Sequence, residues 1–250
     1  YASSAASDVY KRQIYYKPNS LKAKVCVSGA RRLREWIEER KLPINKCGKL
    51  IIPTKEELDS QLDILLKRGI ENGAKVEMLK ESEIREIEPK INCITGRGIW
   101  SPNTCVVDPI KVLKSIEEEL KVYGVQIVKN IPNFDFKKNT SSISLSNGEM
   151  INYATLINCS GLHADEVAKK FNAGKDYVLL PFKGMYWELK STCKIDIRTN
   201  IYPVPDLNVP FLGVHFTPNA NNEYVYIGPT ATPAWGRENY NGLKNLDLHL

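Results

Sequence analysis

Apolar residues recur at helical spacing in several stretches of the chain, and each stretch presents them on one face. The clearest stretches are 20–41, 58–66, 109–124 and 163–171. Each pattern predicts an amphipathic helix that packs its apolar face against the rest of the protein. The third stretch is the best marked, because Asp108 suits a helix cap, Pro109 suits the first turn and Gly124 suits the end.

Short apolar or alternating runs lie between these helices and predict strands. They are 48–52, 76–79, 98–101, 125–128, 143–145, 150–153, 155–159, 177–180, 185–189, 211–216 and 224–227. Asn147-Gly148 predicts a hairpin turn between two of them. The run 155–159 is apolar without alternation, which is typical of a strand buried on both faces of a parallel sheet. Beyond Tyr177 only strands and Pro-, Asn- and Gly-rich loops follow, and this favours a second, antiparallel domain.

The composition is that of a globular protein with a buried core. The chain has 250 residues, of which 42% are hydrophobic. Its 35 basic and 29 acidic residues give a formal charge of +6, but the two signs are interspersed, which argues against nucleic-acid binding. The excess reflects either a Lys-, Asn- and Ile-rich codon bias or a positive field that attracts anionic substrates. No apolar run approaches the roughly 18 residues of a membrane helix.

Several kinds of site have no sequence signature here. The six cysteines stand singly, without a C-x-x-C pair or a metal-type spacing to a histidine, so we expect reduced thiols and no metal site. The chain also contains neither a G-x-G-x-x-G turn nor a Walker loop.

The ends of the chain read as incomplete. Residues 3–13 match the translation of a sequencing-library adapter, so we expect residues 1–13 to be an artefact and exclude them from the fold. There is no start methionine, and the chain stops at Leu250 without a terminal tail. These observations predict a fragment truncated at both ends.

Two places in the sequence can carry chemistry. Ser160-Gly161, between an apolar run and a helix, allows the backbone to approach a phosphate or ribose, although such turns also occur in ordinary α/β packing. His215 lies in an otherwise apolar strand, where alternation places it on one face with Gly213 and Thr217. The glycine would leave space above the imidazole for a ligand; the alternative is a histidine satisfied within the core.

Two cations stand in the loop-rich C-terminal part, Lys183 and Arg237. Either can hold the carboxylate of an acidic substrate. The alternative is a solvated cation on a loop.

The order of short motifs resembles the L-2-hydroxyglutarate oxidase/dehydrogenase family of the D-amino-acid-oxidase superfamily, over residues 14–240. Two motifs are specific for that family, Ile201-Tyr-Pro-Val-Pro-Asp206 and Pro210-Phe-Leu-Gly-Val-His-Phe-Thr217. Val107-Asp108-Pro109 and Asn158-Cys-Ser-Gly161 are shared with the wider superfamily.

The resemblance implies a fold of the mixed α/β class. It would contain part of a Rossmann-like FAD-binding domain interleaved with an antiparallel, β-rich substrate domain. The expected division is 14–46 for an FAD-domain helix, 47–100 for the first part of the substrate domain, 101–175 for an FAD-domain portion with a β-meander, and 176–250 for the antiparallel substrate domain.

The resemblance also implies FAD as the cofactor and names residues near it. Ser160 and Gly161 would approach its nucleotide part, and the backbone of Asn133 would meet the adenine. Cys159 and Gly184 complete the expected cofactor set.

The implied chemistry is oxidation of a small anionic 2-hydroxy acid, most simply L-2-hydroxyglutarate, to the 2-oxo acid. His215 would be the base, although another histidine upstream of the visible chain is an equal alternative. Tyr202 and Thr217 would orient the substrate, and Lys183 or Arg237 would bind a carboxylate.

Rival functions remain open at the level of the sequence. An oxidase of amines, amino acids or glycerol 3-phosphate has the same fold, and a non-catalytic binding fragment is the alternative of another class. For an enzyme we expect oxygen or a quinone as the electron acceptor. The expected location is the cytoplasm, with peripheral association at the inner face of the membrane as an option.

Overall fold

The computed structural model of the chain describes residues 14–131, 133–190, 192–193, 195–205 and 213–247. The expected adapter segment 1–13 and the first residues of the predicted strand 211–216 lie outside the described residues. The chain divides into two compact units. Unit 1 comprises the described residues within Tyr1–Glu119 and Gly184–Ala231, and unit 2 comprises those within Leu120–Lys183 and Thr232–Leu250. The finer domain division expected from the sequence stays a prediction.

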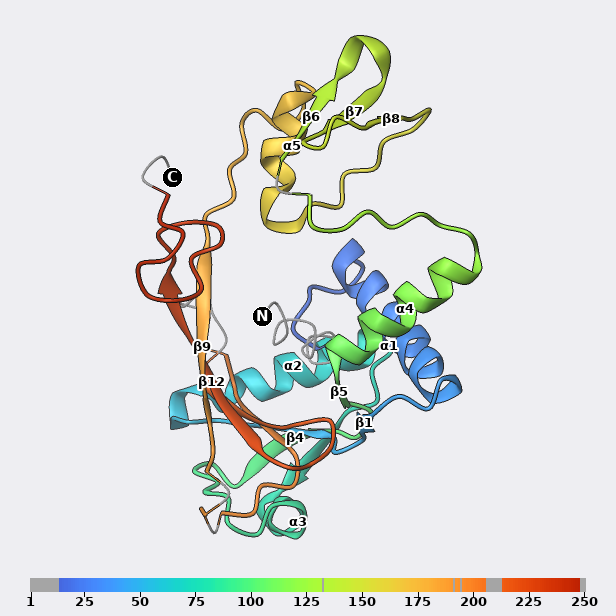
Figure 1. Cartoon of the computed structure of the whole chain (residues 1–250). Helices are drawn as coiled ribbons and strands as arrows, with labels where there is room; N and C mark the ends of the chain where they lie inside the picture. The colour runs from blue at the N-terminus through green and yellow to red at the C-terminus, as the bar shows by residue number, and fades with distance from the viewer. Residues whose placement is uncertain (1–13, 132, 191, 194, 206–212, 248–250) are drawn as a thin grey trace. The chain divides into compact units, whose positions relative to one another are not determined.

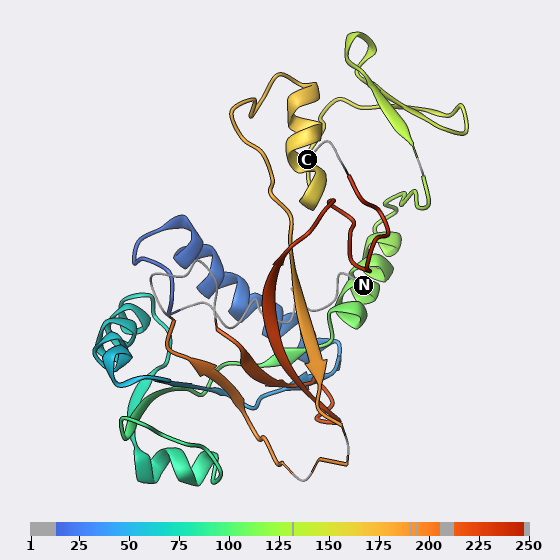
Figure 2. The ribbon, with the colours of Figure 1, turned by 90° about the vertical axis from the view of Figure 1, so that its left-hand side faces the viewer.

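A seven-stranded mixed sheet is the centre of unit 1, with the strand order β3-β4-β2-β10-β11-β12-β9. The strands are β2 (Lys49–Ile52), β3 (Glu77–Lys80), β4 (Arg97–Ser101), β9 (Phe182–Glu188), β10 (Asn200–Pro203), β11 (His215–Pro218) and β12 (Val225–Pro233). β2 and β10 are parallel, whereas the pairs β3–β4, β2–β4, β10–β11 and β11–β12 are antiparallel. The edge strand β9 runs beside β12 (Figure 2).

Three helices of unit 1 lie at the helical stretches predicted above, and the helix Ser60–Glu71 starts without a side-chain cap (Figure 1). They are α1 (Leu21–Glu39), α2 (Ser60–Glu71), α3 (Glu81–Ile87) and most of α4 (Pro109–Val122). The hydroxyl of Ser20 accepts a hydrogen bond from the N–H of Ala23 and caps α1. Asp108 Oδ1 accepts from the N–H groups of Ile110 and Lys111 at 3.0 and 3.1 Å, as the Asp-Pro start predicts.

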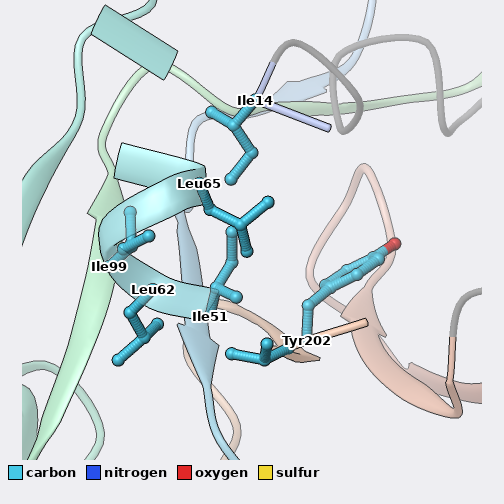
Figure 3. Packing of buried hydrophobic residues seen from close by; sticks show 7 residues of the cluster. Ile14, Ile51, Leu62, Leu65, Ile99 and Tyr202 are labelled. Carbon is cyan, nitrogen blue, oxygen red and sulfur yellow. The ribbon is translucent and has the colours of Figure 1, made fainter. Parts of the chain in front are cut away.

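Alternation along β2 separates the core of unit 1 into two faces. Ile51 packs with Leu62 and Leu65 of α2, and Leu50 packs with Ile84 of α3. Tyr202 belongs to the first of these clusters, and Figure 3 shows its hydroxyl directed away from the aliphatic side chains. A third cluster joins α1 and α4 to the short strands β1 (Ile44–Asn45) and β5 (Val106–Val107).

Unit 2 contains a three-stranded antiparallel meander and a short helix. The strands are β6 (Phe134–Lys137), β7 (Ser142–Leu145) and β8 (Met150–Asn152), and the helix is α5 (Ala164–Lys170). The predicted Asn147-Gly148 hairpin is confirmed, with Gly148 at φ +87°. The rings of Phe136 and Phe171 meet edge to face at 5.1 Å and join the meander to the end of α5.

Three predicted strands are wrong, because residues 125–128, 155–159 and 177–180 are irregular. Their side chains are open to solvent, with Ile157 78% and Tyr177 76% exposed. A buried strand needs neighbouring strands to pair its backbone groups, and within the described residues these segments join no ladder. The short strands β1, β5, β6 and β10 were not predicted, because they are brief or carry polar residues and proline.

None of the helices in the described part of the chain is long and apolar enough to span a bilayer.

Candidate functional site

Pairing of β2, β10 and β11 brings five side chains onto one face of the sheet in unit 1. Lys49 pairs with Asn200, and Ile201 pairs with Phe216, so Asn200 neighbours Thr217 while Tyr202 neighbours His215. All five are at most 4% exposed. We call Lys49, Asn200, Tyr202, His215 and Thr217 the sheet-face cluster.

His215 is held by its own strand and by a stacked ring. It is 1% exposed, whereas the preceding Val214 is 52% exposed, which confirms the predicted alternation. Its Nδ1 lies 3.1 Å from the carbonyl oxygen of Gly213, an arrangement that places the proton on Nδ1 and the basic lone pair on Nε2. The Tyr202 ring stacks on the imidazole at 3.9 Å and 18°, and the Tyr186 ring stands edge-on at 6.4 Å.

The open space predicted above Gly213 is not there. A Cβ atom on this residue would lie 2.7 Å from Cγ of Pro203. The glycine therefore serves the close approach of β10. Aromatic rings lie against the imidazole, and the volume next to Gly213 is occupied by Pro203.

Lys49 was missed by the sequence reasoning. Its side chain is 1% exposed, and its ammonium lies 5.1 Å from the ring centroid of Tyr15 and 5.7 Å from that of Tyr202. Each such contact contributes on the order of 0.5–2 kcal/mol. The available signal was a lysine at the start of the apolar run Lys49–Ile52, because a buried strand rarely begins with a cation.

Asn200 is fully buried beside Lys49. Its Nδ2 donates to the carbonyl oxygen of Gly48 at 2.7 Å and to Cys47 Sγ at 3.2 Å. Its Oδ1 accepts no hydrogen bond among the described residues. A buried acceptor left in this state costs about 1–3 kcal/mol.

The two cations that the sequence nominated for substrate binding lie in unit 2 and have protein partners. Lys183 Nζ donates to the backbone oxygen and to Oδ1 of Asn239, at 3.3 and 3.1 Å. Arg237 is bidentate to Asp165, at 2.7 and 2.9 Å, with both side chains at most 8% exposed. Hydrogen bonding by Arg237 holds the pKa of Asp165 far below its usual range. Roles for Lys183 and Arg237 in substrate binding stay predictions, which this geometry does not favour.

His163 occupies a second charged position in unit 2. Its Nδ1 lies 2.9 Å from Glu166 Oε2, and its Nε2 lies 3.1 Å from Glu238 Oε1. Hydrogen bonding to Glu166, and then to Glu238, raises the pKa of His163 above its ordinary value of 6.5.

Unit 2 also contains a cavity of about 570 Å³. It is lined by Asn133, Phe134, Phe136, Ser160, His163, Glu166, Val167 and Lys170. The structure thus brings together Asn133 and Ser160, two residues expected to contact a nucleotide. Gly161 follows with φ +54° and open space where a Cβ would stand, so a ligand can approach its backbone. Aromatic rings with adjacent polar groups fit the nucleotide part of FAD.

The two other residues of the expected cofactor set have different surroundings. Cys159 is exposed in the irregular segment before this turn. Gly184 is required by packing, because a Cβ there would lie 2.7 Å from Cβ of Pro229. Their cofactor contacts stay predictions. In the described residues no group of His, Cys, Asp or Glu side chains could hold a metal ion.

Two curated relatives of this chain carry the same name. The chain is 39% identical over 241 residues to the mitochondrial L-2-hydroxyglutarate dehydrogenase of Caenorhabditis elegans. The aligned region covers 94% of this chain and 55% of that protein. It is 33% identical over 248 residues to the Homo sapiens protein of the same name, covering 94% and 53%. The chain therefore spans about half the length of the curated relatives it matches.

Solved structures share the fold at lower identity. L-α-glycerophosphate oxidase from Mycoplasma pneumoniae has a TM-score of 0.73 at 22% identity, covering 94% of this chain and 63% of that one. Glycine oxidase from Geobacillus kaustophilus has a TM-score of 0.71 at 16% identity, covering 90% and 60%. The family model for FAD dependent oxidoreductases matches residues 1–246. The chain belongs to this FAD-dependent oxidoreductase family, DAO.

Proposed function

We propose that the chain contributes to an FAD-dependent enzyme that oxidises an L-2-hydroxy acid, L-2-hydroxyglutarate, to the 2-oxo acid. The observation that carries the proposal is the buried stack of His215 on Tyr202, formed by the two motifs most specific to the resembled family. Identity of 33–39% to L-2-hydroxyglutarate dehydrogenases over 94% of the chain supports it.

The residues of the sheet-face cluster have distinct roles in this proposal. His215 Nε2 takes the proton of the substrate hydroxyl, since the Nδ1 contact with Gly213 leaves the basic lone pair on Nε2. Tyr202 fixes the plane of the imidazole by stacking, and Thr217 is a polar neighbour for orienting the substrate. FAD, when bound, supplies the acceptor for the hydride from the substrate carbon.

The residues that would hold the nucleotide part of FAD lie in unit 2. Ser160, Gly161 and the backbone of Asn133 line or adjoin the cavity there. Oxygen or a quinone is the proposed electron acceptor, and a cytoplasmic protein with peripheral membrane association is the proposed location.

The test is anaerobic reduction of the flavin-loaded protein by a panel of substrates. L-2-hydroxyglutarate should give the highest kcat/KM, its D enantiomer should be a poor substrate, and glycine, L-proline and glycerol 3-phosphate should be inactive. Reduction by an amine or by glycerol 3-phosphate, without reduction by 2-hydroxy acids, would move the proposal to another member of the family. A flavin-loaded protein that no substrate reduces would favour the non-catalytic alternative.

A further inference from the structure

The proposed substrate is an anion, and the sheet-face cluster contains a cation that the proposed function has not used. Lys49 lies on the same sheet face as His215 and touches the ring of Tyr202, which stacks on that histidine. Lys183 and Arg237 lie in unit 2, where they contact Asn239 and Asp165. Among these cations, Lys49 is the one on the same sheet face as the candidate base, with Tyr202 of β10 on the strand between them.

The position of Lys49 is not one that folding alone favours. The other residues of β2 are Leu50, Ile51 and Ile52, and all four side chains of the strand are buried. An apolar residue would continue this pattern at lower desolvation cost than an ammonium group. A lysine here is therefore better explained by a function of its charge.

Asn200 shows that the part of the sheet face beside Lys49 is polar. Its side chain is fully buried on the strand next to Lys49, and its Oδ1 has no hydrogen-bond partner among the described residues. The single O–H donor of an ionised 2-hydroxy acid is the group that His215 receives in the proposed function, so Asn200 adds polar character beside Lys49 and the carboxylate is left for the lysine.

We infer that Lys49 binds a carboxylate of the substrate. This inference rests on the proposed function, because it takes an anionic 2-hydroxy acid as the ligand. An ammonium carries three N–H donors, so it can bind a carboxylate oxygen in addition to its other contacts. A full negative charge also attracts it more strongly than the faces of Tyr15 and Tyr202 do.

The first experiment compares Lys49→Met with Lys49→Arg in the flavin-loaded protein. The dissociation constant of L-2-hydroxyglutarate from stopped-flow reduction should rise about 10- to 100-fold in Lys49→Met, as expected for loss of a charge-assisted hydrogen bond. The limiting reduction rate at saturation should fall less than about tenfold, and Lys49→Arg should stay near the wild type. Glutarate binding, followed by calorimetry, should weaken in parallel and needs no turnover.

Lys46→Met is the matched control, because it removes the same charge from an exposed lysine that pairs with Glu38 at 2.6 Å. If Lys46→Met weakens binding as much as Lys49→Met, the effect is long-range charge, and the inference is overturned. If Lys49→Met lowers flavin content or Tm, Lys49→Gln replaces it, and the affinities should rank wild type, Arg, Gln. Unchanged affinity in the folded variant also overturns the inference.

Methyl esters of the substrate identify the carboxylate and separate this inference from the proposed function. One of the two monoesters blocks the carboxylate that Lys49 binds, and its affinity should be the same for the wild type and Lys49→Met. The other monoester keeps that carboxylate, and Lys49→Met should weaken its binding as much as it weakens binding of the diacid. If the wild type oxidises L-2-hydroxyglutarate and neither ester shows this coupling, the inference fails alone. If it oxidises a different carboxylate with Lys49-dependent affinity, the proposed function fails and the role of Lys49 stands.

Discussion

Each unit of the molecule carries a histidine within a polar cluster, and the two clusters differ in the charge and the burial of the groups around that histidine. In unit 1, His215 is 1% exposed and faces aromatic rings and uncharged polar groups, with Lys49 on the same sheet face. In unit 2, His163 is partly exposed and lies between Glu166 and Glu238. The described contacts join opposite charges in the second cluster, whereas in the first they join a cation to aromatic rings. Paired opposite charges suit a structural contact, and a buried cation on the same sheet face as the candidate base suits the proposed site.

The surroundings of the two clusters differ in the same sense. Within the described residues, all three hydrophobic core clusters belong to unit 1. Unit 2 leaves large apolar side chains such as Ile157 and Leu180 exposed. Unit 1 therefore has the apolar support that a precisely placed site requires.

The largest expected effect is on the rate of flavin reduction, at His215. In the flavin-loaded protein, His215→Asn should lower the rate of flavin reduction by about 10²- to 10⁴-fold, the usual scale for loss of a general base. Anaerobic stopped-flow reduction by L-2-hydroxyglutarate, normalised to bound FAD, measures this. Val214→Ala, at the exposed neighbouring position, is the control and should leave the rate unchanged. An unchanged rate in His215→Asn would exclude His215 as the base.

A smaller effect, on stability and not on chemistry, is expected at Arg237. Arg237→Met leaves Asp165 buried without its bidentate partner, and Tm should fall by roughly 5–10 °C. Thermal unfolding followed by circular dichroism measures the change. The matched control is Arg198→Met, which removes an exposed pair with Asp196 and should shift Tm by about 1 °C or less. A variant that keeps its Tm but binds substrate weakly would restore the role predicted from the sequence for Arg237.

Local patterns in the sequence were sufficient for the helices and for the position of His215. The caps at Ser20 and Asp108 are made by residues within a few positions of each helix start. Alternation placed His215 and Thr217 on the buried side of one strand, which needs no knowledge of distant residues.

Features that depend on distant partners could not be predicted in this way. Lys49 becomes part of the site only because β2 pairs with β10, whose residues come much later in the chain. The charge of Arg237 was visible in the sequence, but its engagement by Asp165 was not. Residues 155–159 have the composition of a buried strand, yet a strand forms only where neighbouring strands pair with it.

The smallest expected effect is the pH dependence of the stability that His163 contributes through Glu166 and Glu238. Because Glu166 and Glu238 raise the pKa of this histidine in the folded protein above 6.5, its stabilising contribution is fully present below pH 6.5. The contribution is lost as the pH rises through the raised folded value. Wild-type Tm should therefore exceed that of His163→Gln at pH 6 by a few degrees, and the difference should shrink steadily toward pH 9.

Both side chains of each pair are about half exposed, so 1 M NaCl should reduce the difference at pH 6. Glu166→Gln should bring the pKa of His163, followed by its NMR ring-proton shifts, closer to the ordinary value than Glu238→Gln does, since Glu166 has the larger influence. A Tm difference that stays constant from pH 6 to 9 would show that His163 stabilises the folded protein by packing and not by charge.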